Sequence, residues 1–191
     1  MSRFLQRLEL HGFKSFQSKV AIDFLDGITV IVGPNGCGKS NVLDGLKWVL
    51  GETSAKSLRG GKMADVVFRG SAGHKPSGMA QVTLTCNNGA GTLPVDASEV
   101  SIQRRLFANG DSEYYANKAR CRMRDVHELF MDTGLGADGY SVIEQGRIGE
   151  LVAARPEQRR EIFEEAAGIS RYKARREETL RKLVRTEEDL V

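Results

Sequence analysis

A short segment that begins at Gly33 contains the residue types that hold a phosphate group. The residues 33–40 read G-P-N-G-C-G-K-S and match the pattern G-x-x-x-x-G-K-S. In this pattern a glycine-rich turn lets successive backbone N–H groups converge on one anion, since glycine has no Cβ to block its approach. Lys39 would bridge the β- and γ-phosphates, and the hydroxyl of Ser40 would be a ligand of Mg²⁺. The pattern predicts a site for a nucleoside triphosphate.

The residues on either side of this turn predict the elements that position it. Residues 29–32 form an apolar, β-branched run that indicates a buried strand, and residues 41–49 have the apolar period of a helix. A helix that begins near Lys39 directs its positive dipole end at the bound anion. The alternative is a chance glycine-rich turn before an ordinary helix. Strand, turn and helix in this order favour the phosphate site.

Several other segments of the first two thirds of the chain predict strands. They are residues 4–10, 20–24, 66–68, 81–85, 100–107 and 113–116. Asp26-Gly27 and Asn109-Gly110 are hairpin signals, so the sheet is expected to be mostly antiparallel. The glycine-rich turn at residues 33–40, called the phosphate turn from here on, then follows the third predicted strand, residues 29–32. This order argues against a simple small GTPase. Asn117-Lys118-Ala119-Arg120 also has arginine where a guanine-reading aspartate would be needed.

From Arg124 onward the pattern becomes helical. Val126, Leu129 and Phe130 suit a short helix, and residues 171–189 are dense in both charge signs around a narrow apolar seam. A helix with so many charged residues cannot be buried in a globular core. Its narrow apolar seam therefore predicts the start of a coiled coil. A solvated terminal helix is the alternative. The pattern runs to Val191 without a cap, so the helix is expected to continue in a longer chain.

Composition restricts the class of protein further. A chain of 191 residues has room for one sizeable domain or a domain with an appendage, and its net charge of +3 does not by itself indicate a nucleic-acid partner. Cys37, Cys86 and Cys121 form no C-x-x-C pair, which supports neither a disulfide framework nor a zinc site. Without a long apolar stretch or a signal-peptide core, we expect a cytoplasmic protein with no membrane partner.

Six separate motifs together resemble the N-terminal head of SMC (structural maintenance of chromosomes) proteins, and the bacterial chromosome-partition form is the most similar. The motifs are residues 12–16, 33–41, 48–52, 56–62, 143–147 and 163–168. They extend over essentially the whole chain, so the resemblance is more specific than the phosphate turn alone. Cys37 stands where a small residue, commonly serine, is usual, but the backbone cradle does not depend on that side chain.

The resemblance implies an α/β fold, an ABC-type P-loop ATPase head split across a long chain. Residues 1–168 would be its N-terminal lobe, a mixed sheet with an antiparallel β subdomain, and residues 169–191 would begin a coiled-coil neck. The signature motif and the acidic strand with the catalytic glutamate belong to the C-terminal half, and this sequence contains neither. The full-length dimer is then an ATPase that organises, condenses and segregates chromosomal DNA, whereas this fragment is expected to be inactive alone.

The resemblance also assigns roles to individual residues. Gln145 would reach Mg²⁺ with Ser40, Arg59 would lie near the phosphates and act with Lys39 in catalysis, and Lys14 and Ser15 would contact the base region. A surface glutamine and a solvated arginine are the alternatives for Gln145 and Arg59. The expected ATP site as a whole consists of Lys14, Ser15, Gly33, Pro34, Asn35, Gly36, Cys37, Gly38, Lys39, Ser40, Asn41 and Gln145.

Four cations are candidates for contact with double-stranded DNA. They are Lys62, Arg120, Arg122 and Arg124. If residues 119–124 form an extended chain, the three arginines lie on one side of it and form a basic row. Such a row suits phosphate contacts without sequence preference. Solvated charge is the alternative, and Arg104 and Arg105 are assigned instead to the surface of the sheet.

The resemblance finally implies partners and leaves two rival functions. The partners are the chain's own C-terminal head half, a second SMC subunit in a homodimer, and the kleisin-type accessory subunits ScpA and ScpB. One rival is a split-head ATPase of DNA double-strand-break repair, whose coiled-coil apex carries a zinc-binding Cys-x-x-Cys instead of a hinge. The other is a non-catalytic, nucleotide-gated scaffold that binds DNA.

Overall fold

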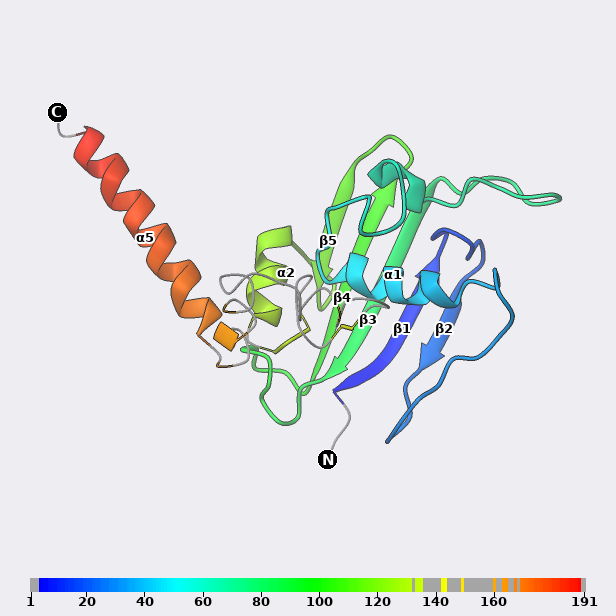
Figure 1. The fold of residues 1–191 in the computed structure, drawn as a ribbon, viewed down its shortest axis with the longest axis horizontal. Coiled ribbons are helices and arrows are strands. Elements are labelled where there is room, and N and C mark those ends of the chain that lie inside the picture. The colour runs from blue at the N-terminus through cyan, green and yellow to red at the C-terminus, as the bar shows by residue number, and fades with distance from the viewer. Residues whose placement is uncertain are drawn as a thin grey trace. The chain divides into compact units, whose positions relative to one another are not determined.

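The computed structural model describes residues 4–131, 133–135, 142–143, 149, 160, 163–164, 167 and 169–189. The elements, in chain order, are β1 (Leu5–His11), β2 (Val20–Asp23), α1 (Lys39–Val49), the 3₁₀ helix η1 (Met63–Val66), β3 (Met79–Asn87), β4 (Glu99–Phe107), β5 (Ser112–Ala116), β6 (Ala119–Cys121), α2 (Met123–Phe130) and α5 (Ser170–Asp189) (Figure 1). The chain forms two compact units, Met1–Leu129 and Phe130–Val191, and each is described by itself.

The first unit contains a six-stranded sheet in the order β2-β1-β3-β4-β5-β6. Every pair of neighbouring strands in it is antiparallel, as predicted. Asp26-Gly27 forms no hairpin, however, because no described strand follows it before α1. Alternation along the strands gives the sheet two different faces. Leu84 and Ile102 are paired and fully buried on one face, whereas Gln81 is paired with Arg105 on the polar face.

Helix α1 lies across the apolar face of the sheet (Figure 1). Gly45 allows the close approach, because a Cβ at this position would lie 2.4 Å from Cδ2 of Leu10 on β1. Trp48, three residues further on, is completely buried, and its ring centroid lies 5.3 Å from that of Phe13. The packing of α1 against the sheet thus holds the helix in place, and with it the glycine-rich turn that leads into its first residue.

Two turns of the sheet follow directly from their residues. Asn109-Gly110 connects β4 to β5 as predicted, with Gly110 at φ 97°, and the Oδ1 of Asn109 accepts a hydrogen bond from the N–H of Asp111 at 3.0 Å. Asn117 and Lys118, at φ 47° and 69°, form the two-residue turn between β5 and β6. Two successive residues with positive φ are typical of a type I′ hairpin.

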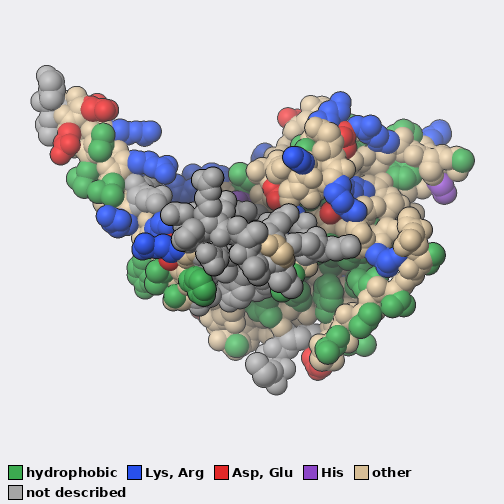
Figure 2. All heavy atoms as spheres, in the orientation of Figure 1, with side chains coloured by type: hydrophobic (Ala, Val, Ile, Leu, Met, Phe, Trp, Pro, Cys, Tyr) green, Lys and Arg blue, Asp and Glu red, His purple; other side chains and the backbone are tan. Residues whose placement is uncertain are grey.

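The prediction of a buried strand at residues 29–32 is wrong. These residues adopt no strand, and Ile28, Val30 and Val32 are 93%, 71% and 83% exposed. They belong to the long loop between β2 and α1, along which Figure 2 shows a row of hydrophobic side chains. The apolar pattern indicates a strand that needs neighbours on its edges, and no described strand pairs with this segment.

Residues 66–68 were also predicted as a strand, and this prediction is wrong too. Met63–Val66 forms the 3₁₀ helix η1, and Val67 makes only an isolated bridge to Phe13. Val66, Val67 and Phe68 are buried, so the apolar run reflects packing around a single bridge and not a strand. Burial alone does not distinguish a strand from an irregular buried segment.

In the second unit, α5 is a helix of 20 residues, as the charged periodic pattern predicted. The apolar side chains of its seam are exposed, among them Tyr172, Leu183 and Val184. Among the described residues, no helix combines the length and the apolar character that a membrane crossing requires. The predicted boundary between residues 168 and 169 remains a prediction, since most residues between Gly136 and Gly168 lie outside the described ones.

Candidate functional site

The glycine-rich turn leads directly into α1. Gly38 is the N-cap residue at φ 97°, a left-handed conformation, and a Cβ there would lie 2.9 Å from the Oγ of Ser15. Both the backbone angle and the space therefore require glycine. In the described structure no side chain caps the helix, and its first turn contains no acidic residue. The N–H groups at the start of α1 therefore face the turn without a side-chain acceptor, as an anion site requires.

Lys39 lies inside this turn. Its ammonium donates hydrogen bonds to the carbonyl oxygens of Gly33 and Pro34, each at 2.6 Å, and lies 3.8 Å from the sulfur of Cys37. These acceptors are neutral, and a phosphate oxygen would be a stronger, charge-assisted acceptor. The thiol of Cys37 is exposed, and a Cβ on Gly33 would lie 2.8 Å from its sulfur. The structure thus brings the predicted lysine and glycines together, with Ser40 exposed beside them.

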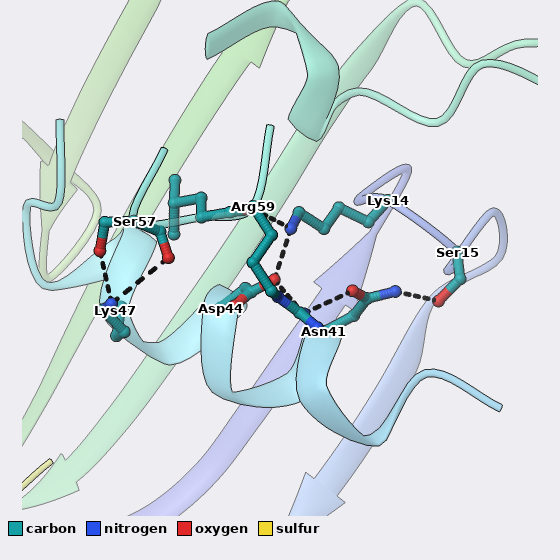
Figure 3. A network of polar contacts seen from close by, with 8 residues as sticks. Lys14, Ser15, Asn41, Asp44, Lys47, Ser57 and Arg59 are labelled. Atoms are coloured by element: carbon teal, nitrogen blue, oxygen red, sulfur yellow. Dashed lines mark hydrogen bonds and ion pairs between the residues drawn. The ribbon is translucent and has the colours of Figure 1, made fainter. Parts of the chain in front are cut away.

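One face of α1 carries three polar residues at a spacing of three. Asn41, Asp44 and Lys47 point from this face toward neighbouring loops (Figure 3). Asp44 is buried, and its carboxylate accepts hydrogen bonds from the ammonium of Lys14 and the guanidinium of Arg59. Lys47 donates to the hydroxyl of Ser57 at 2.5 Å. Contacts along this face hold the loop that follows α1 against the helix.

Three of the predicted site residues meet around Asn41. Its side-chain amide donates to the hydroxyl of Ser15 at 2.9 Å, and its Oδ1 accepts from Arg59 at 3.0 Å. Lys14 lies in the same network, but its ammonium donates to Asp44 and to the carbonyl of Leu58. Contact of Lys14 with a nucleotide base therefore stays a prediction, and the described contacts give this residue a structural role.

Lys14 and Arg59 also share an uncommon backbone conformation. Their φ angles are 49° and 56°, in the left-handed region, where a residue with a Cβ costs about 1–3 kcal/mol. Residues held in this way occur at sites where the surrounding contacts fix the side chain. Here both side chains reach the same carboxylate, that of Asp44. The two strained residues therefore mark the edge of the candidate site.

Arg104 lies at the other end of α1. The prediction that it serves the sheet surface is wrong, because its side chain points inward between Ile102 and Leu106 and is almost fully buried. It donates to the carbonyls of Trp48 and Glu52 at 2.8 and 2.7 Å, where a helix end favours a cation. Burial lowers the pKa of Arg104 to about 10. Arg105, on the polar face, does serve the sheet surface, where it donates to Gln81.

Sequence reasoning missed Asp44, Lys47 and Arg104. The i, i+3 spacing of Asn41, Asp44 and Lys47 on a helix that must pack against a sheet was an available signal. Alternation along residues 100–107 likewise places Arg104 on the same side as Ile102. The partners of these charges lie 10 to 56 residues away in the sequence, which spacing cannot indicate.

The predicted row of arginines on an extended chain is wrong. Strand β6 ends at Cys121 and α2 begins at Met123, so Arg124 is helical. Arg120 lies 3.9 Å from a carboxylate oxygen of Glu113, Arg122 lies 3.3 Å from one of Asp125, and Arg124 lies 2.7 Å from one of Glu128. Hydrogen bonds from the backbone and side chain of Arg122 lower the pKa of Asp125. Contact of these arginines with DNA stays a prediction, and each of them already has a carboxylate nearby.

The remaining predicted residues are placed as follows. Lys62 precedes η1, and its backbone N–H donates to Asp65 at 3.1 Å. Asn35 and Gly36 lie in the exposed part of the phosphate turn. Gln145 lies outside the described residues, so the structure gives no geometry for this expected Mg²⁺ ligand.

A glycine-rich turn that starts a helix, with lysine and serine in its first turn, defines the class of proteins with a phosphate-binding loop. This chain belongs to the RecF/RecN/SMC N-terminal domain family, whose family model matches residues 4–146. It is 53% identical, over its whole length, to the chromosome partition protein Smc of Clostridium kluyveri, and 49% identical over 98% of its length to that of Bacillus subtilis. It spans 16% of the length of each of these two relatives.

Solved structures show the same fold. The Smc head domain of Pyrococcus furiosus, which has an extended coiled coil and is bound to the C-terminal domain of ScpA, is 36% identical with a TM-score of 0.82, over 99% of this chain and 48% of that one. The SMC head domain of Thermotoga maritima is 38% identical with a TM-score of 0.65, over 80% of this chain and 51% of that one. The fold is therefore that of the N-terminal lobe of an SMC head, as the sequence motifs predicted.

Proposed function

We propose that this chain is the ATP-binding N-terminal half of an SMC ATPase head. The observation that carries the proposal is the phosphate turn, in which Lys39 and the uncapped start of α1 face the same space. In the full-length dimer, ATP-driven engagement of two heads and hydrolysis would organise, condense and segregate chromosomal DNA. Identity over the whole chain to chromosome partition proteins favours this function over a repair-type head.

Magnesium is proposed to bind with the nucleotide. The hydroxyl of Ser40 is exposed in the first turn of α1, and Gln145 would supply a second oxygen. Mg²⁺ bound by few protein ligands and by phosphate oxygens needs no cluster of carboxylates. When bound, the ion neutralises charge on the phosphates. The chain's own residues hold the nucleotide: the turn presents N–H groups, Lys39 offers its ammonium, and Arg59 lies beside Asn41.

The missing part of the catalytic site is proposed to come from the C-terminal half of the head. Residues 25–32 support this, since Leu25, Ile28, Val30 and Val32 expose large apolar side chains along one loop (Figure 2). A contiguous exposed apolar segment marks an interaction surface. Its strand-like sequence suits a partner strand, which would complete the sheet next to the phosphate turn. Residues 1–168 would form the lobe and 169–191 the neck.

The other partners are also proposals. The exposed seam of α5 would pair with the returning helix of a coiled coil, and a ScpA-type subunit would bind near this neck. The Pyrococcus furiosus head domain is bound to the C-terminal domain of ScpA, which supports a partner of this type. A second SMC subunit, ScpB and double-stranded DNA complete the set of proposed partners. Lys62, Arg120, Arg122 and Arg124 remain the candidate DNA contacts. We place the protein in the cytoplasm, on the nucleoid.

Nucleotide binding by the chain tests the main proposal. Titration with a fluorescent ATP analogue and Mg²⁺ is expected to saturate, and Lys39→Ala is expected to weaken the affinity by about tenfold or more, since each tenfold corresponds to about 1.4 kcal/mol. Lys75→Ala, an exposed lysine far from the turn in sequence, is the matched control and is expected to bind as the unaltered chain does.

Steady-state phosphate release completes this test. The chain lacks the signature motif and the catalytic glutamate, so turnover is expected to be negligible even when ATP is bound. Robust hydrolysis that Lys39→Ala abolishes would contradict the split site. Equal affinity of Lys39→Ala and the unaltered chain would contradict nucleotide binding at this turn.

A further inference from the structure

One buried carboxylate near the phosphate turn has two cationic partners. The side chain of Asp44 is 6% exposed, and its Oδ2 accepts hydrogen bonds from both the ammonium of Lys14 and the guanidinium of Arg59 (Figure 3). A buried carboxylate needs a cation nearby, because an unpaired buried charge is costly. One cation suffices to neutralise the carboxylate. The second cation is therefore not needed for neutralisation and can leave.

The two cations differ in how firmly they are held. The side chain of Lys14 is 12% exposed, and its ammonium has a second buried acceptor in the carbonyl of Leu58. The side chain of Arg59 is 52% exposed, and its other acceptor is the side-chain oxygen of Asn41. If Arg59 left, Lys14 would still neutralise Asp44. If Lys14 left, its own ammonium would lose two acceptors.

Arg59 is connected to the phosphate turn by a short chain of contacts. Its guanidinium donates to Asn41 at 3.0 Å, Asn41 donates to Ser15 at 2.9 Å, and the Oγ of Ser15 would lie 2.9 Å from a Cβ on Gly38. A polyphosphate held at the start of α1 would thus lie near Arg59 and would compete with Asp44 for its exposed guanidinium. Phosphate oxygens are strong, bidentate acceptors for arginine.

We propose that Asp44 is a positioning residue that holds Arg59 against the second turn of α1 until nucleotide phosphates draw the guanidinium away. This inference rests on the proposed function and deepens it, since it names what regulates access of Arg59 to the nucleotide. Lys14 stays on Asp44 in both states and keeps the buried carboxylate neutralised. The contact with Asp44 opposes nucleotide binding, because Arg59 must break it first.

The direction of one mutational effect tests this role. Asp44→Asn keeps the shape of the side chain but weakens the hold on Arg59, so the affinity for Mg²⁺–ATP is expected to rise about threefold to tenfold, where tenfold corresponds to about 1.4 kcal/mol. The gain is expected to vanish in the Asp44→Asn/Arg59→Ala double variant. Asp23→Asn removes a carboxylate that pairs with Arg7 on the sheet, and it is the matched control without effect.

A merely structural role predicts the opposite sign. If Asp44 only supports α1, Asp44→Asn lowers the affinity whether or not Arg59 is present, and the proposal is overturned. Because Asp44→Asn leaves the ammonium of Lys14 without a carboxylate partner and can unfold the chain, a second measurement uses the unaltered protein. In ¹⁵N-arginine NMR, with Arg59→Ala to assign the signal, the Arg59 side-chain resonance is expected to shift on addition of Mg²⁺–ATP. An unchanged resonance at saturation also overturns the proposal.

The experiment separates this inference from the function on which it depends. No binding of Mg²⁺–ATP by the unaltered chain overturns both. Binding that Lys39→Ala abolishes, without any gain in Asp44→Asn, overturns the role of Asp44 and leaves the ATP site standing.

Discussion

Cys86 shows, at the scale of one residue, how burial determines a chemical property. It lies on β3, fully buried on the apolar face of the sheet, and burial raises the pKa of its thiol to about 12 from 9.0. Cys37, in the phosphate turn, is exposed. A thiol that stays protonated in the fold but ionises in the unfolded chain links folding to alkaline pH.

The sign of this linkage gives a prediction. Because the folded pKa of Cys86 lies above its unfolded value, its contribution to the free energy of unfolding is fully present below about pH 9 and is lost as the pH rises toward 12. Cys86→Ala is expected to lower stability at neutral pH through the cavity but to make the decline above pH 9 shallower. Urea unfolding between pH 8 and pH 10.5 measures both.

Cys37→Ala is the matched control for this prediction, because it removes an exposed thiol. Its decline above pH 9 is expected to match that of the unaltered chain. An equally steep decline in Cys86→Ala would mean that the buried thiol does not contribute to the alkaline sensitivity.

At the residue scale, the sequence predicted the glycine-rich turn and the start of α1 at Lys39 well, and the charged network around them poorly. The turn depends on contiguous residues, and the ammonium of Lys39 donates to Gly33 within it, whereas phosphate binding there stays a prediction. Asp44 was missed because its partners, Lys14 and Arg59, lie 30 and 15 residues away. Local patterns carry no information on such pairs, so only the folded structure shows them.

At the scale of elements, the junction between β6 and α2 changes how DNA would be bound. Arg122 lies between the strand and the helix, and each candidate arginine has a carboxylate nearby. Exposed ion pairs of this kind contribute only about 0–1 kcal/mol. DNA phosphates can therefore replace the carboxylates at little cost in stability, and a geometric row is not required for a nonspecific contact.

This gives a prediction for DNA binding. Arg120→Ala and Arg122→Ala are each expected to weaken binding of a DNA duplex equally for unrelated sequences, and to reduce the slope of log affinity against log salt by about 1. Arg7→Ala is the matched control, since Arg7 is an exposed arginine paired with Asp23 on β1 and β2. Fluorescence anisotropy over a range of salt concentrations measures the slopes. Equal slopes for all variants would exclude these two arginines from the interface.

Among the elements, the antiparallel strands were predicted well because hairpins are local. Alternation and Asn109-Gly110 give β4 and β5 within a residue or two. The prediction of a strand at residues 29–32 was wrong because a strand needs a neighbouring strand to pair with. The sequence of the segment itself does not show whether such a neighbour is present. The prediction for residues 66–68 was wrong for a related reason, since a buried run with one bridge need not extend into a strand.

At the scale of the whole molecule, the exposed loop predicts how the proposed halves join. Val30→Lys is expected to weaken association with a polypeptide of the C-terminal head half by about tenfold or more, equivalent to about 1.4 kcal/mol per tenfold, because it places a charge on the surface to be buried. Val95→Lys changes another exposed valine, in the loop between β3 and β4, and is the matched control. Isothermal titration calorimetry measures both. Unchanged affinity for Val30→Lys would place the interface elsewhere.

The exposed apolar segment at residues 25–32 has a consequence for biosynthesis. The relatives are about six times as long as this chain. If a protein of that length joins its two head halves, the N-terminal half waits while the remainder is translated at about 5–20 residues per second, which takes on the order of a minute or more. During that time the segment offers an unpaired, strand-forming surface to neighbouring nascent chains. Ribosome-associated chaperones would then be needed most by the first half of the head.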